Sequence, residues 1–305
     1  MNGEIKINGN YVKSPMNYLG GKYKLLEDII QCFPDGIRNF VDLFAGGLNV
    51  GINVNADTIY VNDRITYLID LYKMFRETPI DTLFDEIRQR IARFGLTRNN
   101  QEGYIALRDE YNQTHQTIDL FVLTCYSFDN QIRFNNSFEF NTSFGMRCFN
   151  DSIKANLIQF CSALKSKNII FSTDDFRNFD FSILSAGDMV YCDPPYLITT
   201  ATYNDGKRGF GDWTETEDAA LMTLLDSMNA NGILFAMSNV LEHKGMQNDD
   251  LIEWSKKYHI THIEMSYSSC NYQFKDRDSK TVEVLITNYP CNVPKRDRMK
   301  PKSLL

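Results

Sequence analysis

The sequence of 305 residues lacks several features that mark common protein classes. Its seven cysteines include no C-x-x-C pair and do not cluster with the four histidines, which fits a reducing cytoplasm and no structural zinc site. No apolar run approaches the length needed to cross a bilayer, and the first residues, Met1 to Lys6, contain no apolar signal core. We therefore expect neither secretion nor membrane insertion.

The chain also lacks an excess of positive charge and a nucleotide-binding glycine string. It has 32 Lys and Arg against 39 Asp and Glu, a net charge of −7 and a pI near 5.2. Because DNA-binding proteins generally set Lys and Arg against phosphates, a DNA-binding role requires a local basic cleft. The absence of G-x-G-x-x-G weakens an assignment to nicotinamide-dependent enzymes. Length and a hydrophobic content of 43% suit one large α/β domain, alone or with a smaller inserted module.

The most informative motif is Asp193-Pro194-Pro195-Tyr196, which follows the apolar run 189–192. A carboxylate at the end of a strand can accept one hydrogen of an exocyclic amine, and a backbone carbonyl of the Pro-Pro step can accept the other. Holding both hydrogens pushes the nitrogen toward tetrahedral geometry and frees its lone pair to attack a methyl group. The tyrosine offers a base an aromatic face. Taken alone, the motif is more simply a strand that ends in a Pro-Pro turn.

A second candidate site is a glycine turn followed by an acid. Residues 39–47 predict a buried strand that ends in the turn Phe44-Ala45-Gly46-Gly47, and the next residues, 48–52, are compatible with a helix. Small residues at such a turn let a ligand approach the backbone closely. A second strand over 58–61 leads to Asp63, spaced like the acid that binds ribose hydroxyls in nucleotide-binding βαβ units. Taken alone, this pair is slightly more typical of scaffold than of a site.

With these motifs in order, the sequence resembles the DNA adenine N6-methyltransferases of the Dam/DpnII type, the alpha-ordered group with an Asp-Pro-Pro-Tyr motif. The similarity covers nearly the whole chain: it begins at Asn17-Tyr18-Leu19-Gly20-Gly21-Lys22 and also takes in Asp174-Asp175-Phe176 and the strands at 235–239 and 282–289. The chain departs from the family where Leu48 follows a glycine-poor turn and where Asp174 replaces a glycine. Both departures bear on how tightly the cofactor is held.

The resemblance implies a Rossmann-like methyltransferase fold that uses S-adenosyl-methionine, releases S-adenosyl-homocysteine and needs no metal. The catalytic residues that it implies are Asp193, Pro194, Pro195 and Tyr196: the target adenine is flipped onto Tyr196, and its N6 attacks the methyl carbon in line with the departing sulfur. Asp63 is expected on the ribose and Asp175 near the adenine amine. The implied cofactor-binding residues are Tyr18, Lys22, Asp42, Phe44, Ala45, Gly46, Gly47, Asp63, Asp175 and Phe176.

The stretch between Asp63 and Asp175 carries helical periodicity over 83–91, 104–111 and 120–126. Within it, residues 131–145 alternate aromatics with Asn, Ser and Thr, which predicts a β-hairpin with a polar face. In the family the matching stretch enters DNA at the recognition site, where Arg and Asn read base edges and aromatics wedge into the stack. The residues implied to contact DNA are Arg133, Asn135, Asn136, Phe138 and Asn141.

An alternative is that the hairpin only supports the fold. In that case Phe138, Phe140 and Phe144 pack on the helices, and Arg133 pairs with Asp129 at i,i+4. Other candidates for a basic cleft are Arg88, Arg90, Arg93, Arg98, Arg147, Lys207, Arg208 and the basic tail.

We therefore predict a mixed, mostly parallel sheet built from residues 1–66 and 166–290, an inserted helical target-recognition module over 67–165, and a flexible basic tail over 291–305. The expected function is site-specific methylation of adenine N6 in double-stranded DNA by a cytoplasmic protein encoded by a prokaryote or a phage. We expect it in a restriction-modification system, beside a separately acting restriction endonuclease, or as a phage or host modification enzyme. Cytosine-N4 methylation, RNA adenine methylation and a non-catalytic DNA- or cofactor-binding role stay open as alternatives.

Overall fold

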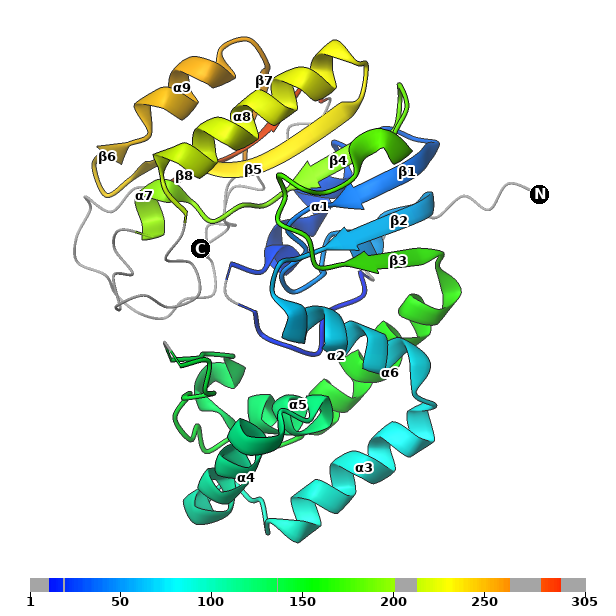
Figure 1. The fold of residues 1–305 in the computed structure, drawn as a ribbon, viewed down its shortest axis with the longest axis vertical. Helices are drawn as coiled ribbons and strands as arrows, with labels where there is room; N and C mark the ends of the chain where they lie inside the picture. Colours follow the sequence, from blue (N-terminus) through cyan, green and yellow to red (C-terminus); the bar gives the residue numbers. More distant parts are fainter. Residues whose placement is uncertain (1–10, 19, 136, 201–212, 264–280, 292–305) are drawn as a thin grey trace, which may run out of the picture.

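The computed structural model describes residues 11–18, 20–135, 137–200, 213–263 and 281–291. Within them a central sheet is covered by helices on both faces, and a helical arm extends from one end (Figure 1). The sheet has eight strands in the order β3-β2-β1-β4-β5-β8-β7, with β6 paired to β5. The strands are β1 (Ile37–Asp42), β2 (Ala56–Asn62), β3 (Ile169–Ser172), β4 (Met189–Cys192), β5 (Leu234–His243), β6 (Met246–Gln247), β7 (His259–His262) and β8 (Thr281–Thr287).

Strands β1 to β5 pair in parallel, whereas β8 runs antiparallel to both of its neighbours, β5 and β7. The predicted α/β fold with a mixed, mostly parallel sheet is confirmed. After β1 the chain builds β2 and β3 on one side and then returns to add β4 on the other. The strand order therefore reverses between β1 and β4, the place where open α/β sheets bind ligands beyond the carboxyl ends of their strands.

The described residues also form helices, which lie on both faces of the sheet and in the arm (Figure 1). Because side chains alternate along a strand, Phe40 of β1 joins the core cluster of α1 and α2, while Val41 joins that of α8 and α9. The helices are α1 (Leu26–Ile30), α2 (Thr66–Glu77), α3 (Ile80–Arg93), α4 (Gln101–Thr114), α5 (Thr117–Tyr126), α6 (Asp151–Ser166), α7 (Leu197–Thr200), α8 (Glu215–Ala230) and α9 (Asp249–Ser255), with 3-10 turns η1 (Lys22–Leu25), η2 (Gly51–Asn53), η3 (Phe128–Asn130) and η4 (Phe181–Ile183).

Several helices begin where a polar side chain caps the first turn. Asn100, Asn150 and Asn248 each accept a backbone N–H from the start of α4, α6 and α9. At α8, Thr214 and Glu217 form a reciprocal capping box. One local expectation was wrong: the residues after the glycine turn form only the short 3-10 turn η2, preceded by Leu48 in a left-handed conformation with φ 55°.

The predicted helical periodicities are confirmed, because they fall within α3, α4 and α5. These three helices lie away from the sheet in the arm (Figure 1). The predicted limits of the inserted module, residues 67 and 165, fall inside α2 and α6, whose Tyr72 and Phe160 rings pack 5.9 Å apart. Since both side chains belong to the core cluster that also contains Phe40 of the sheet, α2 and α6 connect the sheet with the helical arm. The module's limits stay a prediction.

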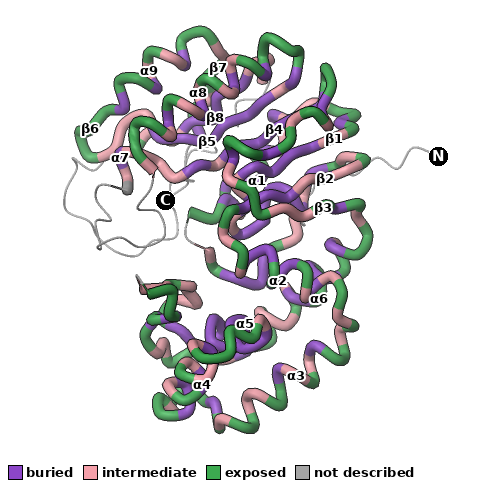
Figure 2. Tube along the Cα trace, viewed as in Figure 1, coloured by how far each residue is buried: buried purple, intermediate pink, exposed green. Residues whose placement is uncertain are grey.

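Burial follows this architecture. The central strands are buried along most of their length, whereas α3 and α9 show exposed residues on their outer sides (Figure 2). Within the part of the chain that the structure describes, no helix is long and apolar enough to cross a membrane.

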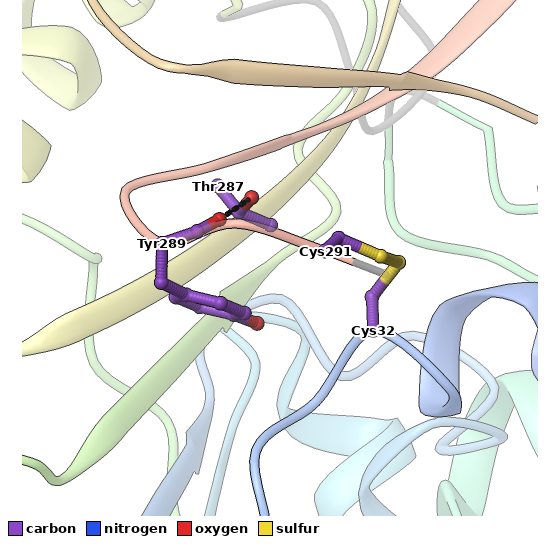
Figure 3. The surroundings of a disulfide bond; sticks show 4 residues. All are labelled: Cys32, Thr287, Tyr289 and Cys291. Carbon is purple, nitrogen blue, oxygen red and sulfur yellow. Dashed lines mark hydrogen bonds between the residues drawn. A yellow bond between two sulfur atoms is a disulfide. The ribbon is translucent and has the colours of Figure 1, made fainter. Parts of the chain in front are cut away.

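A disulfide joins two distant segments: Cys32, just after α1, and Cys291, after β8 (Figure 3). Their Cα atoms lie 4.9 Å apart, although the residues are separated by 259 positions. The spacing of cysteines in the sequence gives no sign of this pair. A disulfide also differs from the expectation of a reducing cytoplasm, in which cysteines stay unpaired. The predicted tail begins at Cys291, and residues 292–305 lie outside the described part of the chain.

Candidate active site

The Asp-Pro-Pro-Tyr motif lies directly after β4, beside the end of β1. The two strands are in register at Asp42 and Tyr191, so the residues that follow each strand emerge side by side. Pro194 is buried, and the chain turns after Tyr196 into α7. The motif therefore lies at the point where the strand order reverses.

Four polar side chains from distant parts of the chain meet at this motif. Lys22 is buried, and its Nζ lies 2.8 Å from Oδ1 of Asp193 and 3.7 Å from Oε1 of Glu283. The Tyr196 hydroxyl lies 2.9 Å from the same Asp193 oxygen and 3.3 Å from the same Glu283 oxygen. Lys22 also donates to the Gly20 carbonyl. We call Lys22, Asp193, Tyr196 and Glu283 the acid cluster.

The two oxygens of Asp193 differ in their surroundings. Oδ1 is bound by Lys22 and Tyr196, whereas no group among the described residues donates a hydrogen bond to Oδ2. The side chain is 19% exposed, so a ligand can reach it. The arrangement leaves Oδ2 available as a hydrogen-bond acceptor.

The glycine turn after β1 is packed closely against Tyr18. Gly46 has a φ of 47°, and a Cβ at this position would lie 3.2 Å from the Tyr18 ring. Its carbonyl accepts a hydrogen bond from the buried Tyr72 hydroxyl, and its N–H donates to Asp63. A side chain at Gly46 would therefore be strained by the left-handed backbone and crowded by the Tyr18 ring, and the backbone of the turn is held by two hydrogen bonds.

Asp63 lies just after β2 and closes this turn. Its Oδ2 accepts from Gly46 N at 2.8 Å and its Oδ1 from Ile65 N at 2.9 Å. Burial raises the pKa of this carboxyl, while the two backbone hydrogen bonds act to lower it. Each oxygen keeps a second lone pair with which it can accept a further donor.

Asp42, the last residue of β1, has a buried oxygen without a partner. Oδ2 accepts from Gly51 N at 2.9 Å, but Oδ1 has no hydrogen-bond partner among the described residues. Burial raises the pKa of Asp42 to about 7; Asp193 and Asp63 add to this effect, and Gly51 opposes it. Since buried polar atoms are normally paired, this oxygen is suited to a cationic or donor group of a ligand.

The segment after β3 contributes an acid and an aromatic group. Asp175 is held by Arg177, whose Nε and Nη2 lie 2.7 and 2.8 Å from its two oxygens, and this hydrogen bonding lowers the pKa of Asp175. Phe176 is buried, and its ring lies 5.5 Å from those of Phe44 and Trp213. The predicted residues Phe44 and Phe176 are thus brought together, and a cofactor amine at Asp175 would share the carboxylate with Arg177.

The sequence reasoning missed three residues near the site. Asn62 is buried and binds the backbone of Leu43 and Asp174, so it ties the end of β1 to the segment after β3. Glu283 and Trp213 are the others: Glu283 lies in the strand 282–289 that the resemblance includes but was given no role there, and no motif marks Trp213. Only the position of Asn62, directly before the predicted acid, could have drawn attention to it.

Residues 127–135 and 137–144 form a loop with antiparallel pairing at two places, which is less regular than the two-stranded hairpin that the sequence predicts. Among the described residues, its pairings are the isolated bridges Ser127 to Phe144 and Phe134 to Phe140. Backbone hydrogen bonds from Asn135 N to Glu139 O and from Asn141 N to Arg133 O flank the second bridge, while both backbone groups of Phe140 bind the side chain of Asn112 on α4. The loop is therefore fixed both by its own antiparallel pairing and by the helical arm.

The predicted DNA-contacting residues are distributed unevenly over this loop. Phe138 is 78% exposed, whereas Phe140 is buried and Phe144 packs on Tyr104, so the alternative of packing on the helices was wrong for Phe138. Asn135 is bound within the loop, by Ser137 and Glu139. Arg133 and Asn141 are exposed, and Asn136 lies outside the described residues.

The other basic candidates are mostly paired with acids. Arg88, Arg90, Arg93 and Arg147 form ion pairs with Asp85, Asp119, Glu110 and Asp129, respectively. Arg98 binds the Cys148 sulfur, and Lys207 and Arg208 lie outside the described residues. The alternative pairing of Arg133 with Asp129 was wrong, because Arg133 binds Gln131 instead. Within the described residues, no group of three His, Cys, Asp or Glu side chains is placed to hold a metal ion.

Comparison with known proteins gives consistent matches. The family model of the D12 class N6 adenine-specific DNA methyltransferases matches residues 18–269. The chain is 48% identical over 289 residues to the Type II methyltransferase M.FokI of Planomicrobium okeanokoites, covering 94% of this chain and 44% of that protein. It is 43% identical over 283 residues to the modification methylase StsI of Streptococcus sanguinis, covering 92% and 43%.

A shorter relative is matched over most of its length. The DNA adenine methylase of Escherichia coli K12 is 28% identical over 263 residues, covering 83% of this chain and 88% of that enzyme. The chain therefore spans less than half the length of the first two relatives but corresponds to nearly all of this one.

Proposed function

The chain belongs to the D12 class of N6 adenine-specific DNA methyltransferases, and we propose that it transfers a methyl group from S-adenosyl-methionine to adenine N6 in double-stranded DNA. The observation that supports this best is the position of Asp193, which follows β4 beside the glycine turn of β1, with Oδ2 available as an acceptor. The acceptor for an amine and the glycine turn proposed to hold the cofactor thus lie at the same edge of the sheet, where the strand order reverses.

The residues around the glycine turn fit the cofactor. Asp42 offers a buried, unpartnered oxygen to its amino group, and Asp63 offers lone pairs to its ribose hydroxyls. Tyr18 and the turn 44–47 form one wall of the proposed cofactor site, while Phe176 and Phe44 offer an apolar surface to the adenine ring of the cofactor. When bound, S-adenosyl-methionine supplies the electrophilic methyl group.

The chain's own contribution to the chemistry is the orientation of the target amine. The Asp193 carboxylate and the Pro194 carbonyl each accept one N6 hydrogen, which frees the nitrogen lone pair for in-line attack on the methyl carbon. Such an amine is accessible only when the base leaves the helix stack, and the Tyr196 ring would receive the flipped base. Once N6 is methylated, its surplus proton leaves through this acceptor pair or to water.

For DNA recognition we propose the loop 127–144. Phe138 presents an exposed ring that can wedge into a base step, and Arg133 and Asn141 of the same loop are also exposed. In this proposal Asn135 shapes the loop through its contacts with Ser137 and Glu139, or exchanges them for a base edge. The names of the relatives support a role as the modification enzyme beside a separate restriction endonuclease.

The proposal is tested by expressing the chain in a host free of adenine methylation and sequencing the host DNA with modification-sensitive reads. We expect N6-methyladenine in one sequence context with the wild type and none with Asp193→Ala, while Asp57→Ala, an exposed aspartate on β2, keeps full activity. Purified Asp193→Ala should still bind S-adenosyl-methionine in calorimetry. Methyl transfer to cytosine N4 or only to RNA, or turnover by Asp193→Ala, would refute the proposal.

A further inference from the structure

Glu283 is a buried acid in the acid cluster that the catalytic motif does not include. It lies on β8, and its side chain is 11% exposed. Its Oε1 lies 3.3 Å from the Tyr196 hydroxyl and 3.7 Å from Lys22 Nζ. A buried carboxylate is costly unless donors compensate its charge, so a second one beside Asp193 calls for an explanation.

Glu283 and Asp193 share the same two donors. Lys22 and Tyr196, which contact Glu283, are also the groups that occupy Oδ1 of Asp193, at 2.8 and 2.9 Å. The Lys22 ammonium lies 5.0 Å from the centroid of the Tyr196 ring. The two acids therefore share one ammonium and one hydroxyl as donors.

The titratable groups around Glu283 come from η1, from β4 and from the segment after β4. Lys22 lies on η1, Asp193 and Tyr196 follow β4, and Tyr191 lies on β4. The charge of Glu283 contributes to the raised pKa of Tyr191. Burial raises the pKa of Glu283, and the charge of Asp193 adds to this, while Lys22 and Tyr196 oppose it. Glu283 thus takes up a proton at a higher pH than an exposed glutamate does.

We propose that Glu283 is a positioning residue for methyl transfer: it anchors Lys22 and Tyr196 on Oδ1 of Asp193 and so keeps Oδ2 free for the target amine. The inference rests on the proposed function. Without the second acid, Asp193 is the one charged partner that the described residues offer to the ammonium and the hydroxyl, and both oxygens of that carboxylate compete for them. The aromatic face of Tyr196 would also lose one of the two contacts that fix its hydroxyl.

The test compares Glu283→Gln and Glu283→Ala with Glu242→Gln, which changes a glutamate on the neighbouring strand β5, opposite Val282. Single-turnover methyl transfer is measured on DNA containing the site found by sequencing with the wild type. We expect rate constants lower by about 10-fold for Gln and about 100-fold for Ala, since small misplacements of reacting groups cost up to about 100-fold. The KM values for DNA and S-adenosyl-methionine should stay unchanged, and Glu242→Gln should match the wild type.

The dependence of the rate on pH separates positioning from simple structural support. Wild-type rates should fall as the pH drops through the raised pKa of Glu283, and this part of the fall should be missing from the pH profile of Glu283→Gln. If the wild type is active and Glu283→Gln is equally active, or if the pH profile of Glu283→Gln is the same as that of the wild type, the inference about Glu283 is overturned while the proposed function stands. A wild type that methylates no DNA would overturn the proposed function and this inference with it.

Discussion

The buried acid Asp42 should make the stability of the protein depend on pH in an unusual direction. Its pKa is raised from 3.8 to about 7 in the folded state, mainly by burial. Between these two values the folded state binds more protons than the unfolded state, so the free energy of unfolding falls as the pH rises. At about 1.36 kcal/mol per pH unit, a shift of this size corresponds to about 4 kcal/mol of lost stability between pH 4 and pH 8.

The change to make is Asp42→Asn, which keeps an acceptor for Gly51 N and removes the charge. Groups remote from Asp42 titrate alike in both proteins, so the quantity to follow is the difference between their unfolding free energies, from urea denaturation at pH 4 to 8. We expect the unfolding free energy of Asp42→Asn, relative to that of the wild type, to rise by up to about 4 kcal/mol as the pH rises.

Asp188 provides the matched control, because it is equally buried but fully paired. Burial acts to raise the pKa of Asp188, but hydrogen bonds from Asn39 and Ser185 and the charge of Arg38 outweigh it and lower the pKa. The stabilisation that it provides is present above the usual aspartate pKa and is lost as the pH falls, so Asp188→Asn should be most harmful at neutral pH. A difference curve for Asp42→Asn that is flat, or that slopes like that of Asp188→Asn, would refute the reasoning.

Three further predictions concern the cofactor, the DNA and the disulfide. Asp63→Ala should weaken S-adenosyl-methionine binding by about 1.5–3 kcal/mol in calorimetry, because a charge-assisted contact is lost; unchanged affinity would rule out its role at the ribose. Arg133→Ala should relax discrimination at one base position by about 1–3 kcal/mol on a panel of single-base site variants, whereas a uniform loss would indicate a phosphate contact. Cys32→Ser should lower the unfolding free energy under oxidising conditions by up to about 5 kcal/mol, since the bridge spans 259 residues, and a reductant should cancel the difference if the bridge is its cause.

The sequence was sufficient to predict the main elements of the sheet. Apolar runs of strand length precede both the glycine turn and the Asp-Pro-Pro-Tyr motif, and they form β1 and β4 as expected. The parallel pairing of these strands then brings Asp42 and Asp193 to one edge. These features depend on local composition and on the few ways in which parallel strands connect.

The contacts that depend on long-range packing could not be predicted in this way. Glu283 meets Lys22 only because β8 inserts beside β5, and nothing in the local sequence of either residue records that neighbour. The same holds for the Cys32 to Cys291 bridge. The alternating pattern around Phe140 predicted antiparallel pairing, which forms as isolated bridges, but it could not show that the backbone of Phe140 also binds a side chain of α4, Asn112.

The late position of β8 in the chain has a consequence for synthesis on the ribosome. This strand fills the space between β5 and β7, yet it is made after both. A nascent chain that has emerged only as far as residue 263 exposes an unpaired edge along the ten residues of β5, apart from its short pairing with β6, and edges of this kind invite pairing with other chains. Such a chain also lacks Glu283. Strand β8 would therefore close this edge of the sheet and complete the acid cluster in one step.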